Sequence, residues 1–172
     1  IDSNAPSTSY TGPSTGDGIA SGYWNWDANS VLLQNNGVPA EGIFPTVATS
    51  SSAGNQAGAA IWEGSSTTEV LVRYRDSTGT WQDSQSFSTS SGKTVSGKGV
   101  AMDSNGNAAA IWAASWDIGI EVSFHGNNDS TWGTPDIIST ASGTGAKTRQ
   151  PSIAINDAGE VAAIWVSRED SS

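Results

Sequence analysis

The fold of this chain follows from the stretch KGVAMDSNGNAAAIW, residues 98–112, because the chain contains it three times in related form. A gapless match, PSIAINDAGEVAAIW, covers residues 151–165, and a longer copy, PTVATSSSAGNQAGAAIW, covers residues 45–62. The closing Trp residues lie 50 and 53 positions apart. Self-similarity at such a period indicates a repeat architecture in which each copy belongs to one structural unit.

Each unit contains the pattern of four short strands separated by turn residues, which is typical of a small antiparallel sheet. In the second unit we expect these strands near residues 99–102, 107–113, 119–125 and 131–139. The Ala-Ala-Ile-Trp segments lack the alternation of a half-exposed strand, so they are expected to be covered on both faces, as in stacked sheets. Small Ala side chains let the sheets approach, and the adjoining Trp fills the space between them.

The predicted fold class is all-β, with β-propeller-like repeats of four-stranded antiparallel blades. Units of about 50 residues with Trp at fixed positions are typical of propellers, and a β-sandwich is the alternative. Because they recur from unit to unit, six Trp residues are assigned to the structural repeat core: Trp26, Trp62, Trp81, Trp112, Trp132 and Trp165.

The predicted organisation is a Ser/Thr/Gly/Pro-rich N-terminal segment, residues 1–18, followed by a propeller-like repeat domain, residues 19–172. The units of that domain lie near residues 45–92 and 98–142, with a split unit formed by residues 151–168 plus 19–35. The result is about three blade equivalents with permuted ends, whereas propellers have about four to eight blades. We therefore expect a homo-oligomer or a part of a longer propeller.

The two ends of the repeat domain are predicted to share a blade, within one molecule or between two. The strand of Val161, Ala163 and Trp165 is apolar enough to be covered on both faces, but no third or fourth strand follows it. Residues 26–33 have the fourth-strand pattern without preceding first and second strands. Pairing of these segments would satisfy amide groups that otherwise line an exposed edge.

Composition excludes several classes of partner. The formal net charge is −10, from 7 Lys and Arg against 17 Asp and Glu, so no basic patch can neutralise several phosphates of a nucleic acid. No run approaches the roughly 18 apolar residues of a membrane span, and we expect no membrane insertion. Cysteine is absent, which removes thiolate metal sites and Cys nucleophiles. A surface of hydroxyls, amides and Gly predicts a secreted protein that works outside the cell or on its surface.

Two turn segments carry a resemblance to a known family: DSTGTW at residues 76–81 and NDSTW at residues 128–132. They resemble the Asp-box turn, S-x-D-x-G-x-T-W, of the BNR/Asp-box family, the sialidase-like β-propellers, in a degenerate bacterial form. The first has an Asp-to-Gly spacing one residue too long, the second lacks the Gly, and the turn near Trp26 has no Asp. The likeness spans about residues 20–168. It implies blades in which this turn joins the third and fourth strands and is structural.

A sialidase-like active site, as the resemblance implies, would need an Arg cluster to hold a carboxylate and a Tyr nucleophile. The Arg and Tyr residues available are Arg73, Arg75, Arg149 and Arg168, with Tyr10, Tyr23 and Tyr74. Tyr74 alternates with Arg73 and Arg75 along one strand, so it faces the opposite side. The acidic residues give no recognisable pair for glycoside hydrolysis. We therefore expect no enzyme, and a sialidase-like glycoside hydrolase is the least favoured function.

Candidate metal ligands are sparse. His125 is the only histidine, and its place at a strand end predicts a solvated turn residue rather than a ligand or catalytic base. The segment DSNGN, residues 103–107, is similar to the opening of a Ca²⁺ loop and makes Asp103 and Asn105 weak calcium candidates. A tight turn with Gly106 at positive φ explains the same residues. No cofactor is expected.

The candidates for ligand binding are the aromatic residues outside the repeat pattern and the polar or aromatic residues beside them: Trp116, Asp117, Trp24 and Tyr23. An exposed Trp116 could stack on a sugar ring while Asp117 accepts hydrogen bonds from its hydroxyls. The same Trp side chain could instead fill a protein interface. We predict a non-catalytic, carbohydrate-binding (lectin-like) module for a glycan or cell-surface polysaccharide. The alternative is a structural protein whose incomplete blades drive oligomerisation or formation of a surface polymer.

Overall fold

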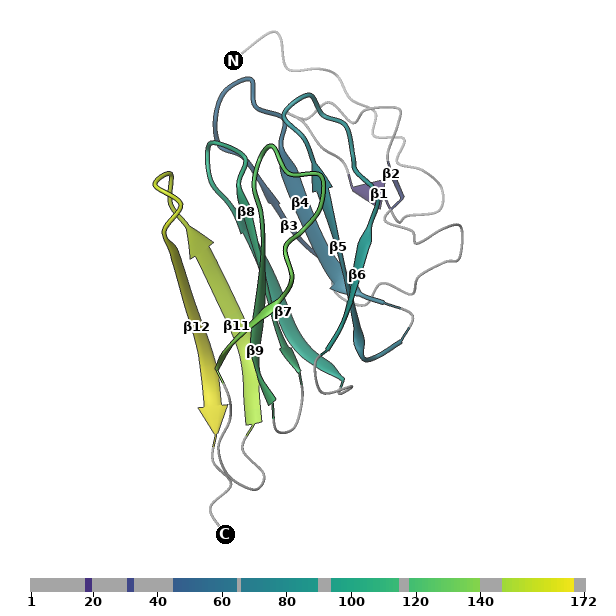
Figure 1. Ribbon diagram of the computed structural model, residues 1–172, viewed down its shortest axis with the longest axis vertical. Helices are drawn as coiled ribbons and strands as arrows, with labels where there is room; N and C mark the ends of the chain where they lie inside the picture. Colours follow the sequence, from purple (N-terminus) through teal and green to yellow (C-terminus); the bar gives the residue numbers. More distant parts are fainter. Residues whose placement is uncertain are drawn as a thin grey trace, which may run out of the picture.

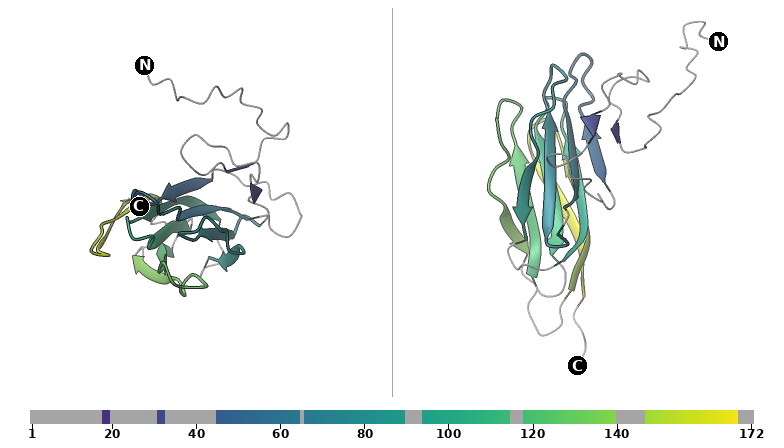
Figure 2. Two further views of the ribbon diagram at one scale, coloured as in Figure 1. Left: turned by 90° about the horizontal axis from the view of Figure 1, so that it is seen from above. Right: turned by 90° about the vertical axis from the view of Figure 1, so that its right-hand side faces the viewer.

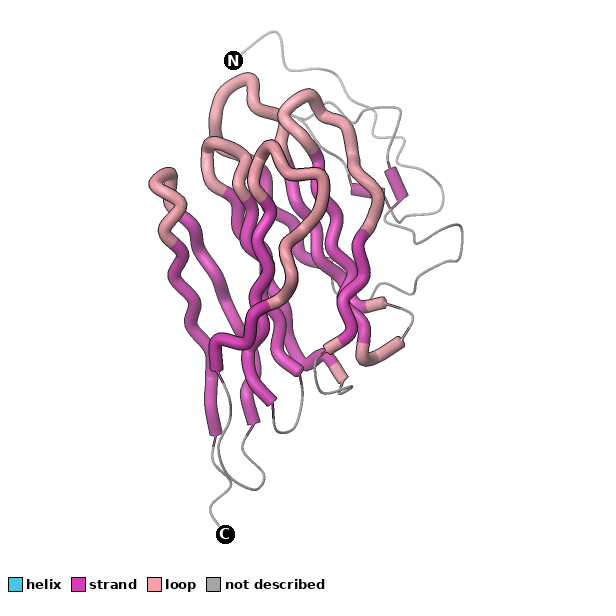
Figure 3. Tube along the Cα trace, viewed as in Figure 1, coloured by secondary structure: helices cyan, strands magenta, loops and turns pink. Residues whose placement is uncertain are grey.

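A computed structural model describes residues 18–19, 31–32, 45–64, 66–89, 94–114, 118–139 and 147–168. Every regular element in these ranges is a β-strand, as Figures 1 and 3 show. This part of the chain contains no helix, and hence none long and apolar enough to cross a membrane. The all-β prediction is confirmed.

Two four-stranded antiparallel sheets form the body of the molecule (Figure 1). The first sheet consists of β3 (Thr46–Thr49), β4 (Gly58–Glu63), β5 (Glu69–Arg75) and β6 (Gln85–Ser88). The second consists of β7 (Val95–Met102), β8 (Ala108–Ala114), β9 (Ile118–His125) and β10 (Asp136–Ser139). In both, the strands lie side by side in chain order, so each sheet is a series of hairpins.

Two pairs of strands complete the described chain. The third sheet has two strands, β11 (Lys147–Ile155) and β12 (Val161–Arg168), which correspond to the first two strands of the full sheets. The short pair β1 (Gly18–Ile19) and β2 (Val31–Leu32) is also antiparallel. In Figure 1 these pairs lie on opposite sides of the body, with β11 and β12 in yellow and β1 and β2 in purple.

The three sheets stack face to face in chain order. β3 and β4 pack against β7, while β11 packs against β7 and β8, and Figure 2 shows the layers from two further sides. The core between the first and second sheets includes Ile61, Val72, Tyr74, Val100, Ala110 and Trp112. The core between the second and third sheets includes Ile111, Ile120, Val122, Ile153, Ala163 and Trp165. The second sheet is therefore covered on both faces, which explains why β8 is buried along its whole length.

The Ile-Trp pair gives every sheet the same polarity. Trp112 points to the first sheet and Ile111 to the third, because successive side chains of a strand face opposite sides. Ile61 likewise points to the second sheet, and Trp165 points back to it. We call the side of a sheet that carries the Trp its rear face and the side that carries the Ile its forward face. The forward faces of the first and second sheets thus meet the rear faces of the second and third sheets, respectively.

Three turns share one hydrogen-bonded geometry. In the turn at residues 103–107, the Asp103 backbone N donates to the Asn107 carbonyl, and the Asn107 backbone N donates to the Asp103 side chain at 2.8 Å. The turns that begin at Asp76 and Asn156 repeat these bonds. The fourth residue of each is a Gly at positive φ, as an αL position in a tight hairpin requires. The turn at the start of the Asp-box-like segment therefore has the same conformation as the turns that join the first two strands of the second and third sheets.

The second and third predicted strands of the second unit agree with β8 and β9 to within one residue, whereas β7 begins at Val95 rather than near residue 99, and the fourth strand also differs. Residues 131–139 were expected to form it, but β10 begins at Asp136. The backbone of Trp132 is instead bonded to the first sheet, since its N donates to Gln85 Oε1 at 2.9 Å and its carbonyl accepts from Gln85 Nε2. Within the described residues the sheets do not close into a ring.

Among the described strands, the two ends of the repeat domain do not pair with each other within one molecule. Val31–Leu32 pairs with Gly18–Ile19, while β12 pairs with β11 alone among the described strands. Within one chain, the forward side of β12 is exposed, so the expected cover on both faces is not present there. Pairing between two molecules stays a prediction.

Candidate functional site

The candidate site is the forward face of the third sheet, formed by side chains that alternate along β11 and β12. Its described members include Ser152, Ala154, Ala162, Ile164 and Val166, together with Arg149, which pairs with Val166, and all are exposed. Ile164 is 72% exposed, whereas the equivalent Ile61 and Ile111 are 0% exposed, because another sheet covers them. Val166 is 51% exposed beside it. A forward face that is core in two sheets is thus open to solvent in the third.

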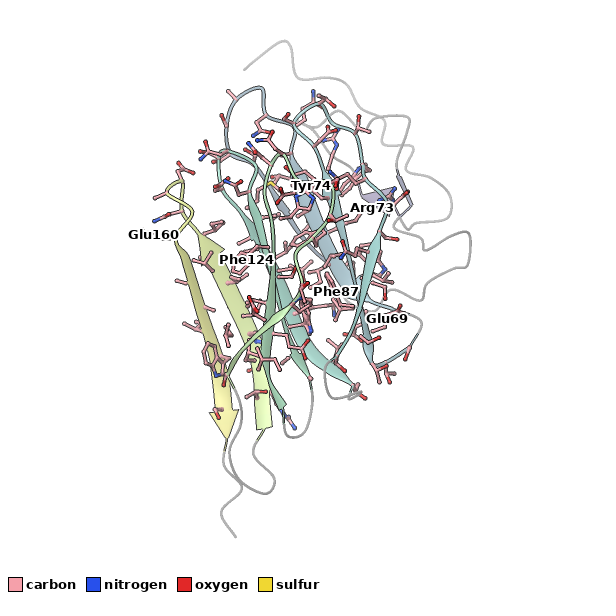
Figure 4. The ribbon with its side chains drawn as sticks, in the orientation of Figure 1. Glu69, Arg73, Tyr74, Phe87, Phe124 and Glu160 are labelled. Carbon is pink, nitrogen blue, oxygen red and sulfur yellow. The ribbon has the colours of Figure 1, made fainter. Side chains whose placement is uncertain are left out.

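A second exposed region adjoins this face, on the forward side of the second sheet. Phe124 is 44% exposed on β9, while the equivalent Tyr74 on β5 is 1% exposed (Figure 4 labels both). Tyr74 is covered by His125 and Trp132, which belong to the third strand and following turn of the next sheet. The third sheet has only its first two strands in the described residues, so Phe124 has no such cover. The exposure of Phe124 marks where a third strand would pack.

The rear face of the first sheet has a matching exposed position. Val47 on β3 is 51% exposed, although the equivalent Val100 on β7 is buried against the first sheet. Ala60, Trp62 and Leu71 on the same rear face are buried. Apolar side chains are therefore exposed on the rear face of the first sheet, on β3, and on the forward face of the third sheet, on β11 and β12.

The interface between the first two sheets contains one buried ion pair. Lys98 Nζ on β7 lies 2.6 Å from Glu63 Oε1 on β4, with the two side chains 4% and 16% exposed. Val166 of β12 stands where Glu63 stands in β4. At this position the open forward face therefore carries Val166 with Arg149 opposite it, whereas the first sheet carries Glu63.

Turns at one end of the stack are hydrogen-bonded across all three sheets. Ser50 Oγ and Asn55 Nδ2 donate to the Ser104 carbonyl at 2.9 and 3.1 Å. The Ser104 backbone N donates to Asp157 Oδ1 at 2.9 Å, and this hydrogen bond lowers the pKa of the exposed Asp157 carboxyl. These hydrogen bonds join the turns of successive sheets at this end of the stack.

His125 is buried, which corrects the expectation of a solvated turn histidine. It is 1% exposed, its ring stacks on Tyr74, and its Nε2 lies 3.1 Å from Gln82 Oε1. Trp132 contacts the imidazole in an edge-on arrangement, with the ring centroids 5.4 Å apart. The strand end of β9 is covered because the turn after β5 folds over it. The residue therefore joins the first and second sheets.

The predicted ligand-binding residues lie outside the described residues. Trp116 and Asp117 fall between β8 and β9, and Trp24 and Tyr23 fall between β1 and β2. Trp26 of the predicted repeat core is also outside them.

The other repeat Trp residues divide into two groups. Trp62, Trp112 and Trp132 are buried, as expected for the repeat core. Trp81 and Trp165 are half-buried and pack against buried clusters of the first and second sheets, respectively. Trp165 lies on the two-stranded third sheet, whereas Trp62 and Trp112 lie on four-stranded sheets.

The weak calcium candidates Asp103 and Asn105 take part in the turn hydrogen bonds. Both carboxylate oxygens of Asp103 accept from Asn107, and Asn105 Nδ2 donates to the Asp157 carbonyl at 3.1 Å. No group of three or more metal-ligating side chains occurs in the ranges described. These contacts are those of a tight turn.

The Arg and Tyr residues considered for an active site have separate contacts. Tyr74 Oη donates to the Gly106 carbonyl of the second sheet, and burial, with the nearby carboxylates of Asp76, Asp103 and Asp129, raises the pKa of Tyr74 to about 12. Arg73 lies on the opposite face over Trp81. Arg75 donates to the turn carbonyls of Gly79 and Gln56. The predicted separation of Tyr74 from the two Arg residues is confirmed.

Comparison with known proteins finds no matching family model, no similar curated protein and no similar solved structure.

Sequence reasoning identified the stacked strands but not which face remains open. The Ala-Ala-Ile-Trp pattern is the same in β4, β8 and β12, so it carries no signal that Ile164 is uncovered. A signal was present for His125, because its equivalent in the first unit is Arg75, and a repeat Trp follows both residues within the next turn, at Trp81 and Trp132. Because Arg75 and His125 hold equivalent positions in two units, they are expected to have similar environments in their sheets.

Proposed function

We propose that this protein is a non-catalytic assembly module of propeller-like units that works by docking a further β-sheet on the forward face of its third sheet. The observation that carries the proposal is the 72% exposure of Ile164, an isoleucine that is fully buried in both equivalent positions. Burying exposed apolar area contributes about 25 cal/mol per Å². A sheet face of this kind is therefore an association surface.

The arrangement of the sheets supports a propeller-like geometry for the assembled state. Chain-order strands within each sheet and a constant forward-to-rear stacking are features of successive propeller blades. The turn that begins at Asp76 joins β5 to β6, the third and fourth strands, which is the place of the Asp-box in the family that the sequence resembles. Hydrogen bonds of Arg75 to this turn and of Tyr74 to the second sheet support structural rather than catalytic roles.

The test is the mass of the protein in solution as a function of concentration. We expect the natural chain to form species larger than 17.6 kDa, and Ile164→Ser and Val166→Ser to shift it toward the monomer without loss of thermal stability. Ile137→Ser is the matched control, because Ile137 is 47% exposed on β10 and pairs with the rear-facing Glu121. A natural chain that stays monomeric at all concentrations, or equal effects of all three substitutions, would contradict the proposal.

Carbohydrate binding by a secreted protein is the second candidate function, and the observation that favours it is the position of Trp116 and Asp117. They fall between β8 and β9 and have no counterparts in the repeat. Trp116→Ala is then expected to abolish binding on a glycan array while stability and assembly stay unchanged. A loss of about 3–5 kcal/mol of stability would instead identify Trp116 as a packing residue.

A further inference from the structure

We propose that the sheet docked on the third sheet comes from a second copy of this chain, whose β1–β2 pair extends the third sheet from β12. The composite sheet would have the order β11–β12–β1–β2, with the last two strands from the second copy. This inference rests on the proposed assembly function and names its partner and its strands.

The two strand pairs are complementary in type. β11 and β12 match the first and second strands of the full sheets, joined by the same Gly-containing turn. The β1–β2 pair matches the third and fourth, because Leu32 follows Trp26 by the same distance as Phe87 follows Trp81. The pairing agrees as well, since Gly18 pairs with Leu32 as Val70 pairs with Phe87. Together, the β11–β12 pair of one copy and the β1–β2 pair of another would therefore provide all four strands of a full sheet.

The faces at the two sides of the stack also match. In the internal interfaces a forward face with Ile61 or Ile111 meets a rear face with Val100 or Ile153. The corresponding exposed residues are Ile164 at the front of the third sheet and Val47 at the rear of the first. A second copy placed one step further along the stack would bring its Val47 to the open forward face. The new contact would be continuous with the interface that the second and third sheets already form.

The contact must be head-to-tail. Joining two forward faces would bury Ile164 against Ile164 but leave both copies of Val47 exposed, whereas a forward-to-rear contact covers both positions. The β1–β2 pair of the second copy would then lie beside β12, and its strand next to β12 would cover Phe124 as β9 covers Tyr74.

The first sheet fixes the register of the proposed pairing. There Glu63 of β4 lies opposite Val70 of β5. Val166 is the equivalent of Glu63, and Gly18 is the equivalent of Val70 by its pairing with Leu32. Gly18 of the second copy is therefore expected opposite Val166. Directly opposite residues of antiparallel strands have Cα atoms about 4.5–5.5 Å apart, which suits a disulfide.

The test uses this register in full-length chains, which contain no natural cysteine. A Gly18→Cys chain is mixed with a Val166→Cys chain and oxidised in about 0.5 M salt, where repulsion between the acidic chains is screened. Pairing raises the local concentration of the two thiols, so we expect the mixed disulfide to form about tenfold faster than in the control. The matched control replaces Gly18→Cys by Ser77→Cys, on an exposed turn away from the proposed contact.

Each outcome decides one point. Preferential Gly18–Val166 cross-linking that Ile164→Ser weakens supports the second copy. Equal cross-linking with the Ser77→Cys control overturns it, as does a monomeric internal disulfide in the doubly substituted chain. If the natural chain associates through Ile164 but the mixed disulfide fails to form, this inference falls and the proposed function stands. If the natural chain does not associate at all, both fall.

Discussion

The imidazole of His125 lies flat against the ring of Tyr74, with the ring centroids 3.8 Å apart and the planes inclined by 17°. The pair joins β9 of the second sheet to β5 of the first, and Trp132 contacts the imidazole edge-on. Burial lowers the pKa of His125 below 6.5, although the Gly126 backbone and the Asp129 carboxylate oppose the shift. A neutral imidazole is thus part of the contact between the two sheets.

Lowering the pH is expected to reduce the stability of the folded chain because of this histidine. Below about pH 6.5 the unfolded chain binds a proton at His125 that the folded chain does not, so the free energy of unfolding decreases toward the lower folded pKa, by at most about 1.4 kcal/mol per pH unit. His125→Gln should remove this component. Urea unfolding of both proteins between pH 5 and 8 measures it, and parallel curves would show that His125 does not titrate in this way.

The Trp residues of β4 and β8 should differ in their response to loss of the indole N–H. Trp112 Nε1 donates to the buried Glu121 carboxyl at 3.0 Å, whereas the buried Trp62 Nε1 has no partner in the described part of the chain. Both substitutions to Phe remove similar volume, but only Trp112→Phe takes a hydrogen bond from Glu121. We expect it to cost about 1–3 kcal/mol more than Trp62→Phe in chemical denaturation. Equal costs would mean that the bond adds nothing to stability.

Alanine substitutions at two turn glycines should distinguish the energetic cost of backbone strain from that of a steric clash. A Cβ at Gly159, φ +79°, would meet no atom within 4 Å, so Gly159→Ala should cost only the αL penalty of about 1–2 kcal/mol. A Cβ at Gly106, φ +91°, would lie 3.2 Å from Ala57 Cβ and 3.3 Å from Tyr74 Oη. Gly106→Ala should therefore be the more destabilising of the two in thermal unfolding. The reverse order would contradict the close packing of this turn on the first sheet.

Replacing only one partner of the Lys98–Glu63 ion pair should lower the stability of the fold substantially. Lys98→Met leaves the Glu63 carboxylate half-buried without its ammonium partner, and we expect a loss of about 3 kcal/mol. Glu63→Leu added to that variant should recover part of the loss, because the double change leaves no uncompensated charge. A double-mutant cycle measures this coupling, and strictly additive effects would show that the two charges act independently.

The repeat and its hairpins could be predicted because local sequence determines them. The Ile-Trp pattern, the turn glycines and the alternating residues of β5 all correspond to observed strands and turns. Tyr74 and Arg73 were also placed correctly on opposite faces, since alternation alone fixes that.

Exposure could not be predicted from the same pattern. Ile164 and Ile111 have nearly identical neighbours in sequence but opposite environments, because their burial depends on whether another sheet follows. The burial of His125 likewise depends on Tyr74, a residue of the preceding unit, and the beginning of β10 depends on contacts between Trp132 and Gln85. Local propensity does not contain these contacts between units.

The chain-order arrangement of strands within each sheet also determines how the protein should fold. Every strand pair in the full sheets joins neighbours in sequence, so the loops to be closed are short and the pairing contacts are local. The second sheet packs against a described sheet on each of its two faces, and we expect β7, β8 and β9 to form the most slowly exchanging amides. Structure would then spread outward from this sheet, and β12, with one strand partner and one covered face, would be the first described strand of the stack to open.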